Sequence, residues 1–179
     1  VPVEKGDWRN LSRASGAADR DPAWSPDGQH VAWFSDASGE YQLMIGDPAG
    51  VEPPRAIGLP GPAFYYQPTW APTSDRIAYT DTDRTLWILD VASGRSTRVD
   101  GDAYAHPERS MNPVWAPGGR YLAYAKRGGN QFRRVWVFDT ETGDAHAVTD
   151  GLADAFSPAW DASGDALYVL ASTDLGVGS

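Results

Sequence analysis

The chain carries three histidines, His30, His106 and His146, and no cysteine. Catalysis by a side-chain nucleophile needs a serine, threonine or cysteine beside a base, and histidine is the usual base near neutral pH. The sequence Gly-x-Ser-x-Gly, which exposes the nucleophile in one large class of hydrolases, is absent. His30 follows a turn sequence, His146 falls in an expected outer strand and His106 precedes a proline in a long loop. Structural or neutral roles are therefore favoured for all three, and no catalytic residue is expected.

Carboxylates are the other side chains that could hold a ligand directly. Asp81-Thr82-Asp83 and the segment from Asp36 to Glu40 resemble the first positions of a calcium loop, yet neither continues with alternating oxygen ligands and a closing glutamate. Glycine-rich phosphate-binding sequences and His-Glu-x-x-His are also absent. We therefore expect hairpin turns at both carboxylate segments, and no metal or cofactor.

Aromatic and charged residues in loops are the strongest candidates for a functional site, because rigid scaffolds commonly present such residues to bind partners. Alternatively, the aromatic residues of the first loop pack over the ends of neighbouring sheets. The basic segment 126–134 is either a solvated hairpin tip or a positive patch for a carboxylate or an acidic neighbouring domain. The candidates for binding a peptide or a partner are Phe64, Tyr65, Tyr66, Tyr104, His106, Arg109, Arg127 and Arg133.

A repeated element positions these loops. Trp24, Trp70, Trp115 and Trp160 recur at intervals of 45 or 46 residues, each in a Pro-x-Trp sequence. A turn follows, as in Ser25-Pro26-Asp27-Gly28, where proline and glycine favour a tight reversal. Repeats of this length, made of short apolar runs and turns, are typical of β-propellers, in which each repeat is one four-stranded blade.

Each repeat predicts four strands. The apolar run after each turn is too short for a helix and predicts a second strand, and a third run ends at an aspartate with a glycine soon after. The fourth strands are weaker, and residues 8–12 match their last positions. Second strands are expected over residues 31–34, 77–80, 122–125 and 167–170, third strands over 41–45, 86–89 and 135–138, and fourth strands over 55–59, 96–99 and 145–149.

The pattern predicts an all-β fold, a β-propeller of four-stranded antiparallel blades that is incomplete within residues 1–179. Blades are expected over residues 22–59, 68–100 and 113–149, and residues 158–179 supply the first two strands of a further blade. Residues 1–21 supply the last strand of a preceding blade and a connection. Since an open propeller leaves strand edges free, the chain expressed alone is expected to dimerise or aggregate by edge pairing.

The expected topology places the candidate residues together. When the four strands of a blade follow one another, the loops between second and third strands lie on the same face as the connections between blades. The two tight turns of each blade lie on the opposite face. We therefore expect a single binding face that carries the aromatic loop, the loop around His106 and the basic loop.

Composition restricts the partners. A net charge of −9 argues against nucleic acid and against an anionic membrane surface, both of which bind basic proteins. No apolar stretch is long enough to cross a bilayer. The absence of cysteine removes disulfides and thiolate metal sites but does not choose between cytoplasm and periplasm.

The sequence Asp21-Pro22-Ala23-Trp24-Ser25-Pro26-Asp27-Gly28 resembles the propeller repeat of TolB and of the non-catalytic propellers of several peptidases. The segments 3–12, 33–41, 148–151 and 171–174 are more specific, and with them essentially the whole chain is similar to the second propeller of tricorn-type proteases. The resemblance implies a large cytoplasmic serine peptidase that degrades peptides, with this propeller as scaffold and as peptide channel or filter. It implies as partners the remaining propeller and catalytic domains of the parent chain, peptides, and further copies in a homo-oligomer. None of the family's catalytic positions falls in this segment.

Two alternatives stay open. A TolB-like periplasmic propeller would bind protein partners without an attached peptidase, and a signal peptide with an N-terminal accessory domain in the full gene would identify it. A prolyl-oligopeptidase-type enzyme would place a hydrolase domain with Gly-x-Ser-x-Gly after the propeller.

Overall fold

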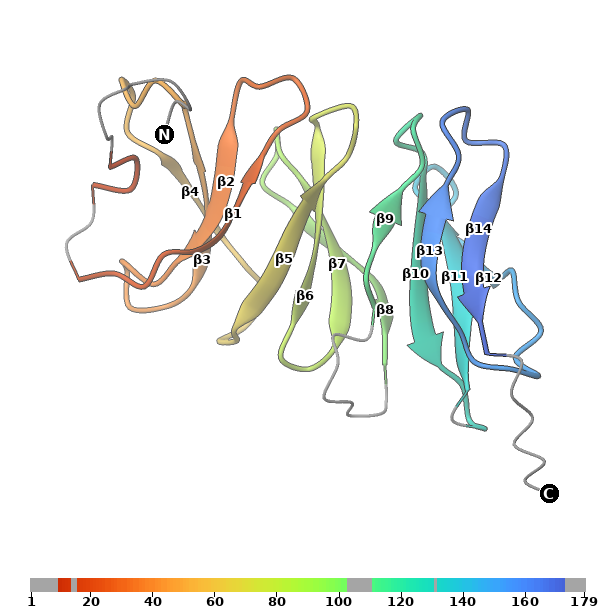
Figure 1. Cartoon of the computed structure of the whole chain (residues 1–179). Helices are drawn as coiled ribbons and strands as arrows, with labels where there is room; N and C mark the ends of the chain where they lie inside the picture. The colour runs from red at the N-terminus through yellow and green to blue at the C-terminus, as the bar shows by residue number, and fades with distance from the viewer. Residues whose placement is uncertain (1–9, 14–15, 103–110, 131, 173–179) are drawn as a thin grey trace.

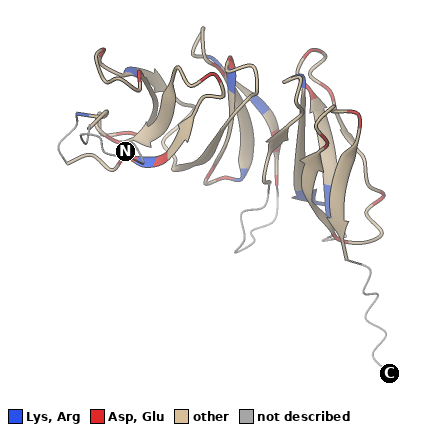
Figure 2. Ribbon diagram, turned by 45° about the horizontal axis from the view of Figure 1, so that its top comes forward, with Lys and Arg blue, Asp and Glu red and all other residues tan. Residues whose placement is uncertain are grey.

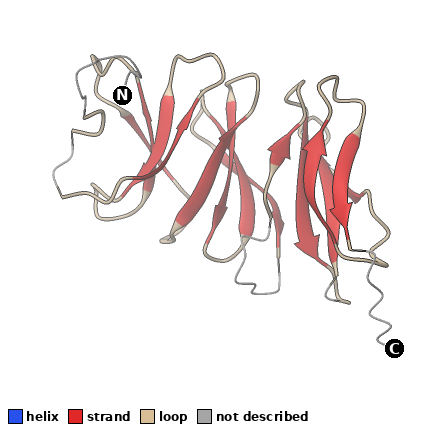
Figure 3. Ribbon diagram, in the orientation of Figure 1, coloured by secondary structure: helices blue, strands red, loops and turns tan. Residues whose placement is uncertain are grey.

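A computed structural model describes residues 10–13, 16–102, 111–130 and 132–172 of the chain. These residues form β-strands joined by turns and loops, with no helix among them (Figure 3). The strands group into three four-stranded sheets and one two-stranded sheet. The predicted all-β fold of four-stranded antiparallel blades is therefore confirmed.

The strands of each sheet follow one another in the chain, and neighbours are antiparallel. We call the sheets blades I to IV, and they stand side by side in sequence order (Figure 1). Blade I contains β1 (Arg20–Trp24), β2 (Val31–Ser35), β3 (Gln42–Gly46) and β4 (Arg55–Gly58); blade II contains β5 (Tyr65–Trp70), β6 (Arg76–Asp81), β7 (Thr85–Asp90) and β8 (Ser96–Gly101); blade III contains β9 (Val114–Trp115), β10 (Tyr121–Arg127), β11 (Arg133–Asp139) and β12 (Ala145–Ala147); blade IV contains β13 (Ala155–Trp160) and β14 (Leu167–Ala171).

The second, third and fourth strands lie within a few residues of their predicted positions. The strand expected over residues 8–12 differs, because residues 10–12 do not form a strand and residues 8 and 9 lie outside the described part. Residues 10–13 instead lie beside the turn between β3 and β4, where the Arg13 guanidinium donates a hydrogen bond to the Gly50 carbonyl. The residues after 172, at the end of the expected fourth unit, also lie outside the described part.

The two faces of the blades differ in their loops. The turns between first and second strands and between third and fourth strands lie on one face (Figure 1). The loops between second and third strands, residues 36–41, 82–84 and, in blade III, 128–130 and 132, lie on the other face with the connections between blades, such as residues 59–64 and 148–154. We call this second face the loop face.

A bulge recurs in the first strand of blades I, II and IV. Asp21, Gln67 and Ser157, each directly before the repeat proline, have φ angles of 52°, 53° and 51°. The pairing register shifts at the same place in each strand. Bulges bend a strand and increase its local twist. The bulge therefore separates the loop-face end of the strand from the segment that carries the repeat tryptophan.

The repeat tryptophans join each blade to the blade before it. The indole Nε1 of Trp70 donates a hydrogen bond to the Ala23 carbonyl at 3.0 Å, and Trp115 donates to Thr69 at 3.0 Å. Trp160 continues the series, with a 3.2 Å bond to Val114. Each acceptor directly precedes the tryptophan of the preceding blade, so the sequence period is also the period of the contact between blades.

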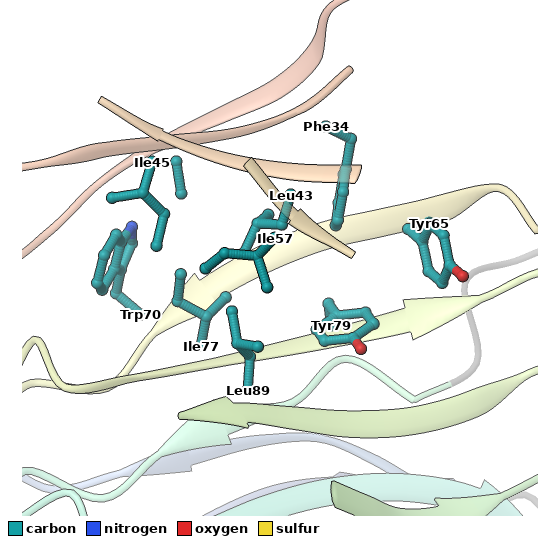
Figure 4. Packing of buried hydrophobic residues seen from close by; sticks show 10 residues of the cluster. Phe34, Leu43, Ile45, Ile57, Tyr65, Trp70, Ile77, Tyr79 and Leu89 are labelled. Atoms are coloured by element: carbon teal, nitrogen blue, oxygen red, sulfur yellow. The ribbon is translucent and has the colours of Figure 1, made fainter. Parts of the chain in front are cut away.

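The apolar core lies between the blades. The cluster between blades I and II contains Phe34, Leu43 and Ile57 from one blade and Tyr65 and Tyr79 from the other (Figure 4). A second cluster joins blades II and III through side chains that include Leu86, Met111 and Tyr124. Between blades III and IV the buried cluster consists of Ala125, Val135 and Ala155. Because successive sheets cover one another, the loop face stands on a rigid support.

Candidate binding face

An aromatic cage surrounds Arg20 on the loop face. Arg20 begins β1, and its guanidinium carbon lies 5.1 Å from the centre of the Tyr41 ring, 5.5 Å from Phe64 and 5.3 Å from Tyr66. These distances are within the range of favourable cation–π contacts. The Arg20 Nη2 atom donates to the Tyr65 carbonyl at 2.7 Å, whereas its Nε is buried without a hydrogen-bond partner among the described residues. The cage joins the loops of blades I and II.

The three consecutive aromatic residues predicted for binding take different roles. Phe64 is 49% exposed and Tyr66 is half-buried, so both remain accessible at the loop face. Tyr65 is fully buried and packs its ring against Phe34 and Tyr79. The alternation of side chains along a strand explains this split, because β5 turns successive residues to opposite sides.

Tyr65 is held in the core by its hydroxyl group. The carbonyl oxygens of Pro60 and Gly61 lie 2.8 and 2.7 Å from the hydroxyl oxygen and share its single donated hydrogen. Burial first, and then the negative charges of Asp81 and Glu40, raise the pKa of Tyr65 to about 12. Tyr65 therefore stays protonated at neutral pH and fixes the loop that precedes Phe64.

A cavity of about 320 Å³ opens beside the cage, between blades I and II. Its walls come from the loop 36–41, the connection 59–64 and the loop 82–84, all on the loop face. Two carboxylates and two aromatic rings share the space. The lining includes Asp36, Glu40, Tyr41, Ala63, Phe64 and Thr82.

Two cations of the predicted positive patch are paired within the chain. The Arg133 guanidinium makes two-pronged contact with Asp154, with Nη2 to Oδ2 at 2.6 Å, and lies 4.1 Å above the ring of Phe156. Lys126 pairs with Asp100 at 2.6 Å and sits over the Trp136 ring. The acidic partners thus come from the neighbouring blade or connection, and acidic and basic residues alternate over the loops and strand ends (Figure 2).

Arg127 lies between blades II and III. Its backbone N–H faces the buried carboxylate of Asp102 at 3.4 Å, and its Nε is buried without a hydrogen-bond partner among the described residues. Arg127 and Arg133 both belong to the basic segment, and the carboxylate that pairs with Arg133 is that of Asp154 in the same chain. A role in binding a partner stays a prediction for both residues.

Tyr104, His106 and Arg109 lie outside the described residues, and their part in a binding face also stays a prediction. The other two histidines have ordinary surroundings: His30 stacks on Trp70 with ring centres 6.4 Å apart, and His146 is exposed in β12. The described part of the chain contains no group of three or more metal-ligating side chains. Within the described residues, no helix has the length and apolar character needed to cross a membrane.

Four residues of this face were not among the sequence candidates: Arg20, Tyr41, Asp36 and Glu40. A comparison of repeats offers a signal for Arg20, because Arg20 and Tyr66 both lie four residues before their repeat tryptophan. That position is the loop-face end of the first strand. No comparable signal exists for the carboxylates, whose segment reads as a hairpin loop and whose neighbours come from another repeat.

Comparison with known proteins agrees with this architecture. The family described as the tricorn protease second beta propeller domain matches residues 1–176. The chain belongs to this family. The crystal structure of the tricorn protease has a TM-score of 0.72 with this tricorn-type propeller at 18% identity, over 86% of this chain and 15% of the tricorn protease.

Other relatives of the tricorn-type propeller include a peptidase. The uncharacterized peptidase YuxL of Bacillus subtilis (strain 168) is 29% identical over 115 residues, which cover 59% of this chain and 17% of YuxL. A protein of Agrobacterium tumefaciens described as a TolB has a TM-score of 0.60 at 19% identity, over 89% of this chain and 57% of its own. An oligogalacturonate lyase from Vibrio parahaemolyticus has a TM-score of 0.60 at 14% identity, over 78% of this chain and 40% of the lyase. The chain thus spans less than a fifth of the tricorn protease and of YuxL, and the solved structures share its fold.

Proposed function

We propose that this chain is a non-catalytic propeller segment of a tricorn-like serine peptidase, in which it acts as a scaffold and as a channel or filter for peptides. The observation that carries the proposal is the match of the tricorn second-propeller family over residues 1–176. The resemblance to a peptidase from Bacillus subtilis supports the same class. Catalysis belongs to other domains of the parent chain.

The loop face supports a role in handling peptides. Phe64 and Tyr66 present accessible aromatic surface next to the Arg20 guanidinium, and a cavity adjoins them. Aromatic side chains on rigid loops give contact area at low entropic cost, which suits varied peptide sequences. Tyr104, His106, Arg109, Arg127 and Arg133 complete the proposed face. The partners of the segment are the remaining propeller and catalytic domains, peptides and further copies of the parent in a cytoplasmic homo-oligomer.

Peptide hydrolysis by the full-length protein tests this proposal. The double variant Phe64→Ala/Tyr66→Ala should lower kcat/KM for peptides of about ten residues, while a short fluorogenic substrate is cleaved as before. Val51→Ala serves as the control, because Val51 is 70% exposed in a turn on the opposite face. Equal effects of the double variant on long and short substrates, or no effect on either, would contradict a channel or filter role.

The domains of the full-length protein decide between this proposal and the two alternatives. A serine peptidase domain with an intervening PDZ-like module is the expected finding. A Gly-x-Ser-x-Gly hydrolase domain directly after the propeller would indicate a prolyl-oligopeptidase-type enzyme. A signal peptide and no hydrolase domain would indicate a TolB-like interaction protein.

A further inference from the structure

The cavity beside the aromatic cage combines negative charge with aromatic surface. Asp36, Glu40 and Tyr41 come from the loop between β2 and β3, and Phe64 comes from the connection to blade II. A cavity of about 320 Å³ lies at the lower end of the volumes of small-ligand sites. Such a space suits one side chain or one chain end rather than a folded partner.

Both carboxylates have oxygen atoms available to a ligand. Asp36 accepts a 2.6 Å hydrogen bond from the backbone N–H of Ala18 through Oδ1, which fixes the carboxylate and leaves Oδ2 without a hydrogen bond from the described residues. The Glu40 carboxylate is exposed and accepts no hydrogen bond from the described residues. The bond from Ala18 therefore orients one acceptor in advance, whereas Glu40 can adjust to the ligand.

The two aromatic rings already contact a cation on this face. The Tyr41 and Phe64 ring centres lie 5.2 Å apart at a tilt of 47°, and the Arg20 guanidinium carbon lies 5.1 and 5.5 Å from them. Arg20 does not line the cavity, and within the described residues it forms no ion pair with Asp36 or Glu40. The cavity therefore keeps the negative charge of both carboxylates while its rings offer further polarisable surface.

The negative charge of Glu40 acts on the neighbouring core. After burial and the charge of Asp81, the Glu40 carboxylate contributes to the raised pKa of Tyr65. Asp81 does not line the cavity, so Glu40 is the lining carboxylate whose charge acts on Tyr65. Carboxylates together with aromatic rings are the combination that binds ammonium and guanidinium groups in proteins.

We propose that this cavity binds the positively charged group of a peptide, either a Lys or Arg side chain or the amino terminus, between Asp36, Glu40 and the rings of Tyr41 and Phe64. The proposal rests on the function proposed above, because it requires peptides to reach the loop face. It gives the face a preference for basic over neutral peptides.

Calorimetric titration of the full-length protein tests the proposal, after treatment with an irreversible serine-hydrolase inhibitor so that peptides are not consumed. Three pentapeptides serve as probes: an acetylated peptide with a central lysine, the same peptide with norleucine, and an all-alanine peptide with a free amino terminus. We expect the lysine peptide or the free-amine peptide to bind about three- to tenfold more tightly than the norleucine peptide at low salt. Whichever of the two binds more tightly identifies the source of the charge.

Variants locate the preference in the cavity. Asp36→Asn/Glu40→Gln keeps the shape of the site and an acceptor for Ala18, and it should abolish the preference. Glu52→Gln is the matched control, since Glu52 is exposed in the turn between β3 and β4 on the opposite face, and it should keep the preference. Equal affinity for all three peptides in the unmodified protein would overturn the proposal, and so would a preference that survives in the double variant.

The outcomes distinguish this proposal from the proposed function. If Phe64→Ala/Tyr66→Ala lowers the cleavage of long peptides but charge preference is absent, the channel or filter role stands and the cation site is wrong. If no peptide binds and that variant leaves cleavage unchanged, both proposals are wrong.

Discussion

The contact between blades I and II and the contact between blades III and IV use the same repeat but are stabilised differently. Ten residues form the buried apolar cluster between blades I and II, five from the second, third and fourth strands of blade I and five from the first, second and third strands of blade II (Figure 4). Three residues form the buried cluster between blades III and IV, and Phe156, Leu167 and Val169 pack against it only partly buried. Apolar burial between blades therefore depends on the strands that follow the first strand of each blade. The described part of blade IV contains one such strand, β14.

An ion pair contributes to the contact between blades III and IV. Arg133 of β11 holds Asp154 of the connection through its guanidinium and through its backbone N–H at 2.7 Å. The Asn130 amide donates to the Gly151 carbonyl at 2.9 Å in the same region. The tryptophan bond is common to both contacts, at 3.0 Å for Trp70 and 3.2 Å for Trp160. The comparison shows that the first strand and its tryptophan align the blades, while the other strands supply most of the hydrophobic stabilisation.

Truncation of matched leucines should give the largest difference between the two contacts. Leu43→Ala removes a fully buried side chain from the cluster of blades I and II, and we expect it to lower the free energy of unfolding by about 2–5 kcal/mol. Leu167→Ala removes a partly buried side chain of β14 from the contact between blades III and IV and should lower it by less, about 1 kcal/mol. Urea denaturation followed by tryptophan fluorescence measures both. Losses of similar size would mean that the two contacts are equally apolar.

Removal of an indole donor tests the shared part of the contact. Trp70→Phe leaves the half-buried Ala23 carbonyl without its partner, and we expect a loss of about 1–3 kcal/mol in the free energy of unfolding. Trp24→Phe is the control, because the Trp24 side chain is 62% exposed and has no hydrogen bond within the described residues, so its effect should be small. The same denaturation experiment compares them, and a larger effect at Trp24 would rule out the alignment role of the indole bond.

The ion pair between Arg133 and Asp154 should make the contact between blades III and IV sensitive to acid. The hydrogen bonds from Arg133 hold the pKa of Asp154 below its usual value of 3.8 in the folded chain. A carboxyl group with a lowered pKa stabilises the fold above its unfolded pKa, and this stabilisation is lost as the pH falls below about 4 through the folded pKa.

Asp154→Asn should therefore cost about 1–2 kcal/mol at pH 7, and its difference from the unmodified chain should shrink as the pH falls below about 4. Amide hydrogen exchange of residues in β11 and β13 reports the local loss, and exchange in β2 and β6 should stay unchanged. Asp83→Asn, at an exposed position without an ion pair in the described residues, is the control. A pH-independent difference between Asp154→Asn and the unmodified chain would show that the pair contributes no charge-dependent stability.

Asparagine substitutions at the bulge before the repeat proline should change the stability of the chain by the same amount in blade II and in blade IV. Gln67 and Ser157 have positive φ angles of 53° and 51°, a region that asparagine occupies several-fold more often than most residues. Gln67→Asn and Ser157→Asn should each raise the free energy of unfolding by roughly 0.5 kcal/mol, because a several-fold conformational preference corresponds to a free energy of this size. Thermal denaturation with replicate melts can detect such a shift. Opposite signs at the two positions would indicate that side-chain surroundings, rather than backbone conformation, decide the effect.

The sequence by itself determined the strands and their order within a blade. Turn segments such as Ser25-Pro26-Asp27-Gly28 and the short apolar runs that follow act between residues close in the chain, so each hairpin can be inferred from local sequence. The spacing of the tryptophans determined the repeat, and with it the propeller class. The loop face also followed from strand order, since it needs no knowledge of side-chain contacts.

The tertiary structure alone decided which residues of that face lie together and which remain accessible. Arg20, Tyr41 and Phe64 are separated by some twenty residues each and meet because blade II packs on blade I. Tyr65 was expected on the binding face with its neighbours, but the alternation of side chains along β5 turns it into the core. Arg133 reads as a free cation in sequence and is paired with Asp154 in the fold. Contacts between residues far apart in the chain depend on how the sheets stack and on the bulge in each first strand, and neither local turn chemistry nor periodicity specifies that packing.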